Sequence, residues 1–291
     1  MKSFDALILG AGPAGLTAAL YLVRGGMSTA LVEKGAPGGQ VLSTAEIENY
    51  PGFPKGIKGW ELADMFSAHL DEYPVERLRG EIVSLEIPAQ EGGWFEARFA
   101  EDGESVRARS VIVCTGAHHR ALGAPGEDRF TGRGVSYCAV CDGNFYRDKD
   151  VAIVGGGDTA CAEAIYLSRI CRKVYVIHRR EDFRAHFTYA EKVKHLPNVE
   201  IFWNNEVQNV VLNDAGRIEA VTVRNAKTGE EHTLACEGLF IAVGSKPETE
   251  WLRGVVKLDK AGYVKAGSDC KTSLVREGHH HRREPRDRLQ I

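Results

Sequence analysis

Two cysteines separated by two residues, and followed at once by an acid, are the part of this sequence best suited to chemistry. They are Cys138 and Cys141, in the stretch Ser136–Gly143, and the acid is Asp142. A Cys-x-x-Cys pair at a turn or helix start lowers a thiol pKa, and the thiolate is the nucleophile of disulfide exchange. Burial can raise the pKa of Asp142 and make it a general acid, although an acid at this place could also cap a helix. We therefore predict that Cys138, Cys141 and Asp142 form the catalytic group.

Redox chemistry is the best use for this pair. The chain has seven cysteines, an odd number, which argues against a framework of structural disulfides. A zinc site would need a second close pair of Cys or His ligands, and none stands out. Haem attachment would need a His after Cys141, where the sequence has Asp142 instead. We expect no metal, and we expect the other five cysteines to be small buried hydrophobic residues.

A glycine-rich turn near the N-terminus has the surroundings of a dinucleotide site. The apolar run Ala6–Leu9 predicts a buried parallel strand, Leu16–Leu22 has helical periodicity, and Thr29–Val32 predicts a second strand that ends at Glu33. Glycines let backbone N–H groups approach a pyrophosphate, and an acid at the second strand's end can accept a hydrogen bond from a ribose 2′-OH. The residues predicted to bind this dinucleotide, FAD or NAD, are Gly10, Gly12, Pro13, Ala14, Gly15 and Glu33.

A second turn of this kind follows the strand Asp150–Val154. Here the pattern is G-x-G-x-x-A, and the next strand, Lys173–Ile177, is followed by basic residues where the first unit has Glu33. Arginine forks match a phosphate in a bidentate manner, so this site favours NADPH over NADH. The residues predicted to bind it are Gly155, Gly157, Asp158, Thr159, Ala160, His178, Arg179, Arg180 and Arg184.

Both turns are followed by a similar arrangement, which indicates an internal repeat. After each turn come alternating segments typical of an antiparallel β-meander, and then a buried strand that ends in glycine, at Gly116 and at Gly244. The 291 residues suffice for two domains. We predict an α/β fold of two Rossmann-like three-layer domains, with residues 116–244 inserted between residues 1–115 and 245–291.

Composition excludes some classes of partner. The net charge is −3, which gives no reason to expect nucleic acid or an anionic membrane as a partner. No apolar run approaches the roughly 20 residues of a membrane span. The N-terminus runs straight into the first predicted strand and leaves no room for a signal peptide, so a cytoplasmic location is expected.

The sequence resembles the bacterial-type, low-molecular-weight thioredoxin reductases, which are flavoprotein disulfide reductases. The resemblance runs from about Asp5 to about Ser273 and rests on both glycine turns, the Cys-x-x-Cys-Asp-Gly stretch, and the two segments Asn49–Phe53 and His178–Ala185. It implies FAD on residues 1–115 and 245–291, and NADPH on residues 116–244, which carry the cysteines.

The resemblance also implies residue roles and partners. It places Cys141 against the flavin, with Cys138 as its more accessible partner. It implies a homodimer, a rotation of one domain against the other, and a thioredoxin-like protein as electron acceptor; a glutaredoxin-like or peroxiredoxin-linked acceptor stays open. Further predicted FAD-binding residues are Gly38, Gly39, Gln40, Asn49, Thr115 and Gly116.

The segment after Leu274 departs from the family pattern. The family has an apolar strand and a Gly-Asp that binds FAD, whereas Val275–Ile291 is hydrophilic, rich in cations and without periodicity, which predicts a loose tail. The codons of His279–Arg282 read in the neighbouring frame can spell Ile-Thr-Thr-Ala, so a shifted frame or an added segment would account for it. The expected consequence is weaker FAD binding, and the alternative function is a non-catalytic nucleotide-binding remnant that has lost its flavin.

Overall fold

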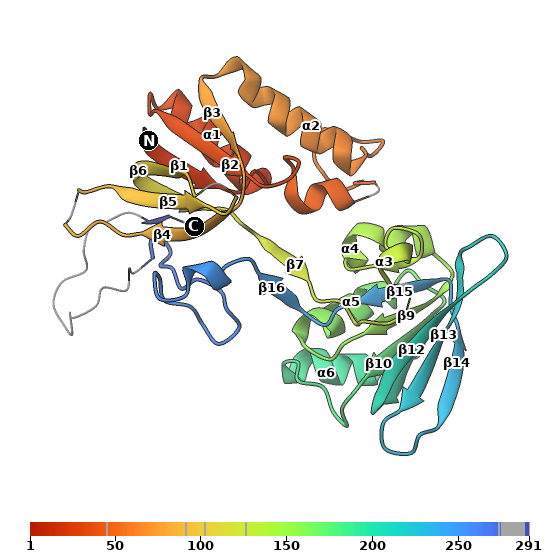
Figure 1. Ribbon diagram of the computed structural model, residues 1–291. Helices are drawn as coiled ribbons and strands as arrows, with labels where there is room; N and C mark the ends of the chain where they lie inside the picture. Colours follow the sequence, from red (N-terminus) through yellow and green to blue (C-terminus); the bar gives the residue numbers. More distant parts are fainter. Residues whose placement is uncertain are drawn as a thin grey trace. The chain divides into compact units, whose positions relative to one another are not determined.

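The computed structural model divides the chain into two compact units (Figure 1). It describes residues 1–44, 46–90, 92–101, 103–125, 127–272, 274 and 289–290. Unit 1 is Met1–His118 with Lys246–Ile291, and unit 2 is His119–Ser245. The crossings expected near Gly116 and Gly244 lie beside these divisions. The chain passes between the units through β7 (Ala117–His119) and β16 (Ser245–Pro247), which pair with one another.

Unit 1 is built on a parallel sheet that one longer strand extends into a meander. Its strands lie in the order β3-β2-β1-β6-β5-β4, with β1, β2, β3 and β6 parallel, and β4, β5 and β6 antiparallel. Its elements are β1 (Lys2–Leu9), α1 (Pro13–Arg24), β2 (Thr29–Glu33), the 3-10 helix η1 (Gly39–Ser43), α2 (Gly59–His69), η2 (Leu70–Glu72), β3 (Val75–Arg79), β4 (Ile82–Glu86), β5 (Phe95–Phe99), β6 (Ser105–Val113) and η4 (Glu250–Leu252).

The two faces of this sheet belong to different layers of the core. In β1, Ile8 packs with Leu16 of α1 on the helical side, whereas Leu7 and Leu9 pack with Phe95 of the meander on the other side. Alternate residues of a strand point to opposite faces, so a continuous apolar run is required when both faces are covered. The apolar run that predicted a buried strand therefore has a direct structural cause.

Unit 2 repeats this plan with a separate meander. A parallel sheet in the order β11-β10-β9-β15-β8 lies between the helices and a three-stranded antiparallel sheet β12-β13-β14 (Figure 1). Its elements are α3 (Glu127–Phe130), β8 (Val135–Ser136), α4 (Ala139–Asp142), η3 (Gly143–Tyr146), β9 (Asp150–Val154), α5 (Asp158–Leu167), β10 (Lys173–His178), α6 (Phe187–Lys194), β11 (Val199–Trp203), β12 (Asn205–Leu212), β13 (Ile218–Asn225), β14 (Glu231–Ala235) and β15 (Gly238–Ile241).

Alternation along β9 again assigns the layers. Ile153 packs in the helical layer with Ala164 of α5, whereas Ala152 packs in the meander layer with Val221 of β13. In unit 1 the last strand of the meander is itself the buried strand β6, but in unit 2 the buried strand β15 follows the meander. The predicted α/β fold with two Rossmann-like three-layer units is confirmed.

The tail differs from its prediction at two residues. Leu289–Gln290 form the short strand β17, which pairs in parallel with Val111 and Ile112 of β6. Strand β5 pairs only with Ser105–Ala108, so the later part of β6 offers backbone groups to another strand. Leu274 makes an isolated bridge with Val256. Residues 275–288 and 291, on which the rest of the tail prediction falls, lie outside the described residues.

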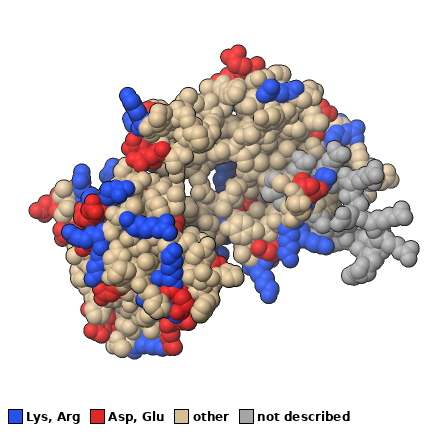
Figure 2. Space-filling view, turned by 180° about the vertical axis from the view of Figure 1, so that it is seen from behind, with Lys and Arg blue, Asp and Glu red and all other residues tan. Residues whose placement is uncertain are grey.

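The surface carries charges of both signs. Figure 2 shows Lys and Arg interspersed with Asp and Glu over the visible face, in keeping with a net charge of −3. None of the helices in the described ranges has the length and apolar character that a membrane span requires.

Candidate functional site

Cys138 and Cys141 form a disulfide at the start of a short helix in unit 2. Their Cα atoms lie 5.2 Å apart, and Cys138 is the N-cap of α4. The Sγ atom of Cys138 accepts a hydrogen bond from the Cys141 N–H at 3.2 Å. Both residues are partly exposed, so the bond lies within reach of a reductant or of another thiol.

Asp142 is held beside this disulfide by a serine. Ser136 Oγ donates to Asp142 Oδ2 at 2.6 Å and accepts the Cys138 N–H at 3.1 Å. Burial raises the pKa of the Asp142 carboxyl, and the hydrogen bond from Ser136 opposes that rise. Asp142 makes no side-chain capping bond to η3, so its carboxyl serves the serine rather than a helix end. Ser136, which is 4% exposed, was not predicted to be part of the site. The feature of the sequence that could have indicated it is a hydroxyl side chain two residues before Cys138.

The first glycine turn in unit 1 forms a tight cradle. Gly10 has a φ of +104°, and a Cβ there would lie 2.3 Å from the Cys114 carbonyl oxygen. A Cβ on Gly15 would lie 1.8 Å from the Gly10 carbonyl oxygen. Gly12 is the N-cap of α1 without a side-chain cap, and Pro13 and Ala14 are exposed. The backbone N–H groups at this helix start are therefore open to a ligand.

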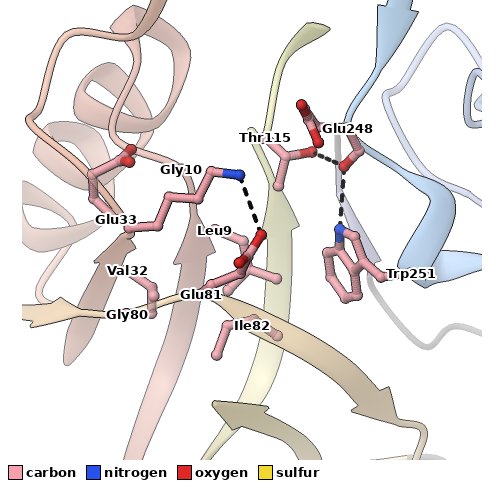
Figure 3. A pocket seen from close by; sticks show the side chains of 11 residues that line it. Leu9, Gly10, Val32, Glu33, Gly80, Glu81, Ile82, Thr115, Glu248 and Trp251 are labelled. Atoms are coloured by element: carbon pink, nitrogen blue, oxygen red, sulfur yellow. Dashed lines mark hydrogen bonds and ion pairs between the residues drawn. The ribbon is translucent and has the colours of Figure 1, made fainter. Parts of the chain in front are cut away.

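Glu33 stands at the end of β2, beside this turn. Its Oε2 accepts the Ala11 N–H at 2.8 Å, and its Oε1 accepts the Gly35 N–H at 2.9 Å. Each carboxylate oxygen has a second lone pair, so the position still suits a ribose hydroxyl. Figure 3 shows the pocket into which this edge opens. Its lining residues are Leu9, Gly10, Val32, Glu33, Lys34, Gly80, Glu81, Ile82, Thr115, Glu248 and Trp251.

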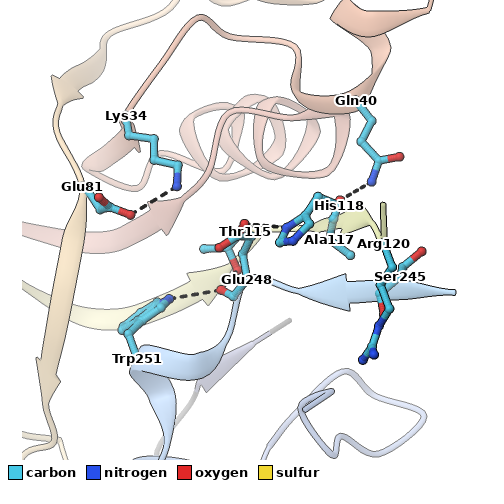
Figure 4. A network of polar contacts seen from close by, with 10 residues as sticks. All are labelled: Lys34, Gln40, Glu81, Thr115, Ala117, His118, Arg120, Ser245, Glu248 and Trp251. Atoms are coloured by element: carbon cyan, nitrogen blue, oxygen red, sulfur yellow. Dashed lines mark hydrogen bonds and ion pairs between the residues drawn. The ribbon is translucent and has the colours of Figure 1, made fainter. Parts of the chain in front are cut away.

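The far wall of that pocket is fixed by one backbone carbonyl. The carbonyl oxygen of Glu248 accepts hydrogen bonds from Thr115 Oγ1 at 2.9 Å and from Trp251 Nε1 at 3.1 Å. The Glu248 carboxylate pairs with His118 Nδ1 at 2.7 Å, and Lys34 Nζ pairs with Glu81 at 3.2 Å (Figure 4). Apart from Thr115, sequence reasoning missed these residues. Glu248 and Trp251 reach Thr115 only because the chain returns to unit 1 through β16.

The loop at Gly38 packs onto the first glycine turn. Gly38 N–H donates to the Ala11 carbonyl at 2.8 Å, and a Cβ on Gly39 would lie 3.1 Å from the Gly12 Cα. Gln40 donates its side-chain amide to the Ala117 carbonyl (Figure 4). The structure thus brings Gly38 and Gly39 to the predicted FAD turn, and Gln40 to the segment that follows Thr115 and Gly116.

Two further predicted FAD residues are exposed. Gly116, with a φ of +69°, follows Thr115 at the end of the buried strand, and a Cβ there would meet no atom within 4 Å. Asn49 lies in the loop before Tyr50, whose ring packs edge-on against Phe66 at 5.8 Å.

The second glycine turn in unit 2 has the same tight beginning. Gly155 has a φ of +148°, and a Cβ there would lie 2.4 Å from the Ala242 carbonyl oxygen. Gly157 is the N-cap of α5 with open space around it, and Thr159 is exposed. Asp158 Oδ1 accepts the His186 N–H at 2.6 Å, which ties the turn to the arginine segment. Ala160 is fully buried.

The basic segment divides into a buried histidine and exposed arginines. His178 is 4% exposed, and its ring lies where a Cβ on Gly156 would be, within 2.2–2.5 Å. Its ring also contacts Phe183 and Trp203, and burial lowers its pKa. His178 therefore shapes the turn rather than presenting a charge. In contrast, Arg179, Arg180 and Arg184 are exposed, and the Arg184 N–H donates to the Gly156 carbonyl at 2.7 Å.

The chain matches known proteins over most of its length. A family described as "Pyridine nucleotide-disulphide oxidoreductase" matches residues 4–277. A thioredoxin reductase of Streptomyces clavuligerus is 41% identical over 274 residues, which cover 93% of this chain and 83% of that protein. A thioredoxin reductase of Bacillus subtilis is 37% identical, with 94% of this chain and 84% of that protein covered.

Solved structures give the same result. The thioredoxin reductase of Streptococcus pyogenes has a TM-score of 0.84 at 40% identity and covers 96% of this chain and 92% of that chain. The thioredoxin reductase of Giardia duodenalis has a TM-score of 0.86 at 32% identity, with 94% and 88% covered. These similarities do not favour the alternative of a non-catalytic remnant. The chain belongs to the pyridine nucleotide-disulphide oxidoreductase family and is an oxidoreductase.

Proposed function

We propose that this oxidoreductase is an NADPH-dependent, FAD-containing reductase of a thioredoxin-like protein disulfide. The observation that carries the proposal is the partly exposed Cys138–Cys141 disulfide beside Asp142, a carboxyl whose pKa burial raises. The names of the similar proteins support the choice of acceptor.

The cysteines supply an exchange reaction whose electrons balance. In the reduced form, the Cys138 thiolate attacks a sulfur of the acceptor disulfide, which breaks that bond and forms a mixed disulfide. Cys141 then attacks Cys138, and the acceptor leaves as a dithiol. Two electrons have moved to the acceptor, the Cys138–Cys141 bond has formed again, and two protons have followed to the acceptor sulfurs.

Asp142 is the proposed proton carrier for this exchange. A carboxyl with a raised pKa retains a proton at higher pH than an ordinary aspartic acid, so it can give that proton to a leaving thiolate. Ser136 fixes the orientation of the carboxyl, because its hydroxyl bonds both Asp142 and the Cys138 backbone.

The turn in unit 1 fits the diphosphate group of FAD. Side chains at Gly10 and Gly15 would collide with backbone, whereas the helix start at Gly12 is open, as a cradle for a diphosphate requires. Glu33 would hold the ribose, and Gly38, Gly39 and Gln40 would line the flavin. When bound, FAD supplies a carrier that accepts a hydride from NADPH and gives two electrons to a disulfide.

The turn in unit 2 fits NADPH. Gly157 has open space at the start of α5 for the diphosphate, and the exposed Arg179, Arg180 and Arg184 provide guanidinium groups for the 2′-phosphate. A homodimer and a cytoplasmic location complete the proposal, and both follow from the resemblance and the sequence rather than from contacts in one chain.

Turnover with an acceptor tests the proposal. Wild-type protein reconstituted with FAD should oxidise NADPH when a bacterial thioredoxin is added. Cys138→Ser should abolish this reaction but leave flavin bleaching by NADPH in the absence of air. Unchanged thioredoxin reduction by Cys138→Ser would refute the relay.

A cysteine outside the pair provides the matched control. Cys270 is a free, exposed cysteine in unit 1. Cys270→Ser should keep wild-type turnover, so loss in that variant too would show that the assay reports general thiol damage.

A further inference from the structure

Glu163 is a half-buried acid beside the helical core of unit 2 that has no part in the reaction above. It lies in the middle of α5, next to the fully buried Ala164. In the sequence, Glu163 is distinguished only as an acid in an otherwise apolar part of the helix, and such an acid usually lies on a solvent-exposed face. The structure contradicts this expectation, because one of its carboxylate oxygens is buried.

The carboxyl of Glu163 contacts the turn that carries the disulfide. Its Oε1 accepts a long hydrogen bond, 3.4 Å, from the N–H of Ala139, the residue directly after Cys138. Its Oε2 is buried and has no hydrogen-bond partner within the described part of the chain. A buried carboxyl oxygen without a hydrogen-bond donor is destabilising, and more so when it is charged. The site therefore favours the protonated form, and burial raises the pKa of Glu163 to about 7, against the opposing Ala139 bond.

No neighbouring charge compensates this acid. Helices α4 and α6, strands β9 and β10 and the 3-10 helix η3 pack against α5. Their ionisable groups, with those of α5 itself, are Asp142, Tyr146, Tyr189, Glu191, Lys192, Lys194, Asp150, Lys173, Tyr175, His178, Asp158, Cys161 and Tyr166, to which reduction adds the thiols of Cys138 and Cys141. Within the described residues, none of them forms a hydrogen bond or an ion pair with Glu163. The one hydrogen bond of its carboxyl is to Ala139, the residue next to Cys138, so a charge on the reduced cysteines reaches Glu163 through this contact.

We propose that Glu163 is a positioning residue that takes up a proton when the Cys138–Cys141 disulfide is reduced, and so couples the stability of the dithiol to pH. This inference rests on the proposed function, because it assumes that the pair cycles between disulfide and dithiol. It adds a second acid, distinct from Asp142, on the α5 side of the cysteine turn.

Reduction of the cysteine pair takes up two electrons and two protons. Two electrons, from NADPH in the proposed reaction or from dithiothreitol in vitro, break the S–S bond. One proton binds one sulfur and leaves a thiol and a thiolate. The new negative charge stabilises the protonated form of Glu163 through the Ala139 contact, and the second proton is held on its carboxyl.

The redox equilibrium of the pair against dithiothreitol, measured over pH, tests the proposal. Full-length protein is equilibrated in dithiothreitol buffers from about pH 6 to about pH 9, quenched with acid and alkylated. Mass spectrometry of the peptide that contains both cysteines then gives the fraction of reduced pair. If the thiolate raises the Glu163 pKa by about one unit, the reduction constant of the wild type falls about ten-fold more over this range than that of Glu163→Gln. Parallel curves for the two proteins would overturn the proposal.

Two further measurements keep this test decisive. Glu200→Gln, on β11, removes an exposed acid that pairs with Lys173 at 2.7 Å, and its curve should follow the wild type. If Glu163→Gln does not fold, infrared difference spectra of Asp142→Asn should show a protonated carboxyl band that grows on reduction near neutral pH, and an unchanged band would overturn the proposal. Neither measurement needs NADPH, bound FAD or a protein acceptor, so its failure is separate from failure of the proposed function.

Discussion

Gly15→Ala tests whether the first turn is held as tightly as the structure indicates. A Cβ at this position would lie 1.8 Å from the Gly10 carbonyl oxygen, and the two atoms must separate by about 1 Å or more before the contact is tolerable. Overpacking of this kind costs about 1–3 kcal/mol, and occasionally more. The higher helix propensity of alanine offsets up to about 1 kcal/mol of this cost, because Gly15 lies within α1. The expected net loss is about 1–2 kcal/mol of unfolding free energy.

The same displacement should reduce FAD affinity. The carbonyl that must move belongs to the turn whose N–H groups would hold the diphosphate, and each 1.4 kcal/mol lost is about a ten-fold change in the dissociation constant. Urea unfolding followed by circular dichroism gives the stability, and titration of flavin fluorescence gives the affinity. We expect FAD affinity to fall about ten-fold or more.

A second turn in the same chain makes this prediction refutable. The equivalent position in unit 2 is Ala160, which is fully buried and is accommodated. If Gly15→Ala matched the wild type in both stability and FAD affinity, the first turn would tolerate a methyl group as the second does, and the reasoning from the Gly10 contact would be wrong. Gly92→Ala is the control: its φ is +76° with open space around it, so strain of about 1–2 kcal/mol without loss of FAD affinity is expected.

Three other changes follow from the charges in unit 2. Asp142→Asn should slow disulfide exchange most at the pH where the wild-type carboxyl still holds its proton, since burial raises its pKa; pH–rate profiles of thioredoxin reduction with both proteins check this, and identical profiles would contradict it. Glu163 has a folded pKa of about 7 against an ordinary 4.5, so wild-type stability should fall by a few kcal/mol as the pH rises from about 4.5 to about 7, and Glu163→Gln should lose this dependence in urea titrations. Arg179→Ala should raise the KM for NADPH about ten-fold or more and leave that for NADH unchanged, because a charge-assisted bond to a phosphate is worth about 1.5–3 kcal/mol. Arg172→Ala, which removes an exposed partner of Asp150, should change neither KM.

The sequence predicted the fold well where local chemistry decides it. Apolar runs such as Ala6–Leu9 are required because both faces of their strands are covered, and the segment Leu16–Leu22, whose periodicity is helical, lies within α1. Glycine turns were visible because a side chain there meets backbone, as at Gly10. The pairing of β17 could not be predicted from the sequence of Leu289–Gln290. It depends on the fact that β5 pairs only with the first part of β6, which leaves Val111 and Ile112 for another strand.

The site was predicted only as far as residue type reveals it. Cysteines and arginines stand out in any sequence, but Glu248 acts through its backbone carbonyl, which no side-chain pattern can reveal. His178 was grouped with the arginines by its charge type, whereas the structure buries its ring against Gly156, a residue without a side chain. What decides these cases is which atoms the chain crossing and the core bring together.

The two acids beside the disulfide illustrate why burial has to be seen before a role is assigned. Asp142 follows Cys141 directly, so its position along the chain suggested a role. Glu163 lies 22 residues after Cys141 and reaches the cysteine turn only because α5 packs on α4. Both have raised pKa values for the same reason, burial, but their hydrogen bonds differ. Asp142 receives a short bond from a hydroxyl that can reorient, which suits a group that gives up its proton repeatedly. Glu163 receives one long bond from a fixed amide, and its other oxygen has no partner among the residues that the structure describes, which suits a group that responds to charge rather than one that transfers protons to an acceptor.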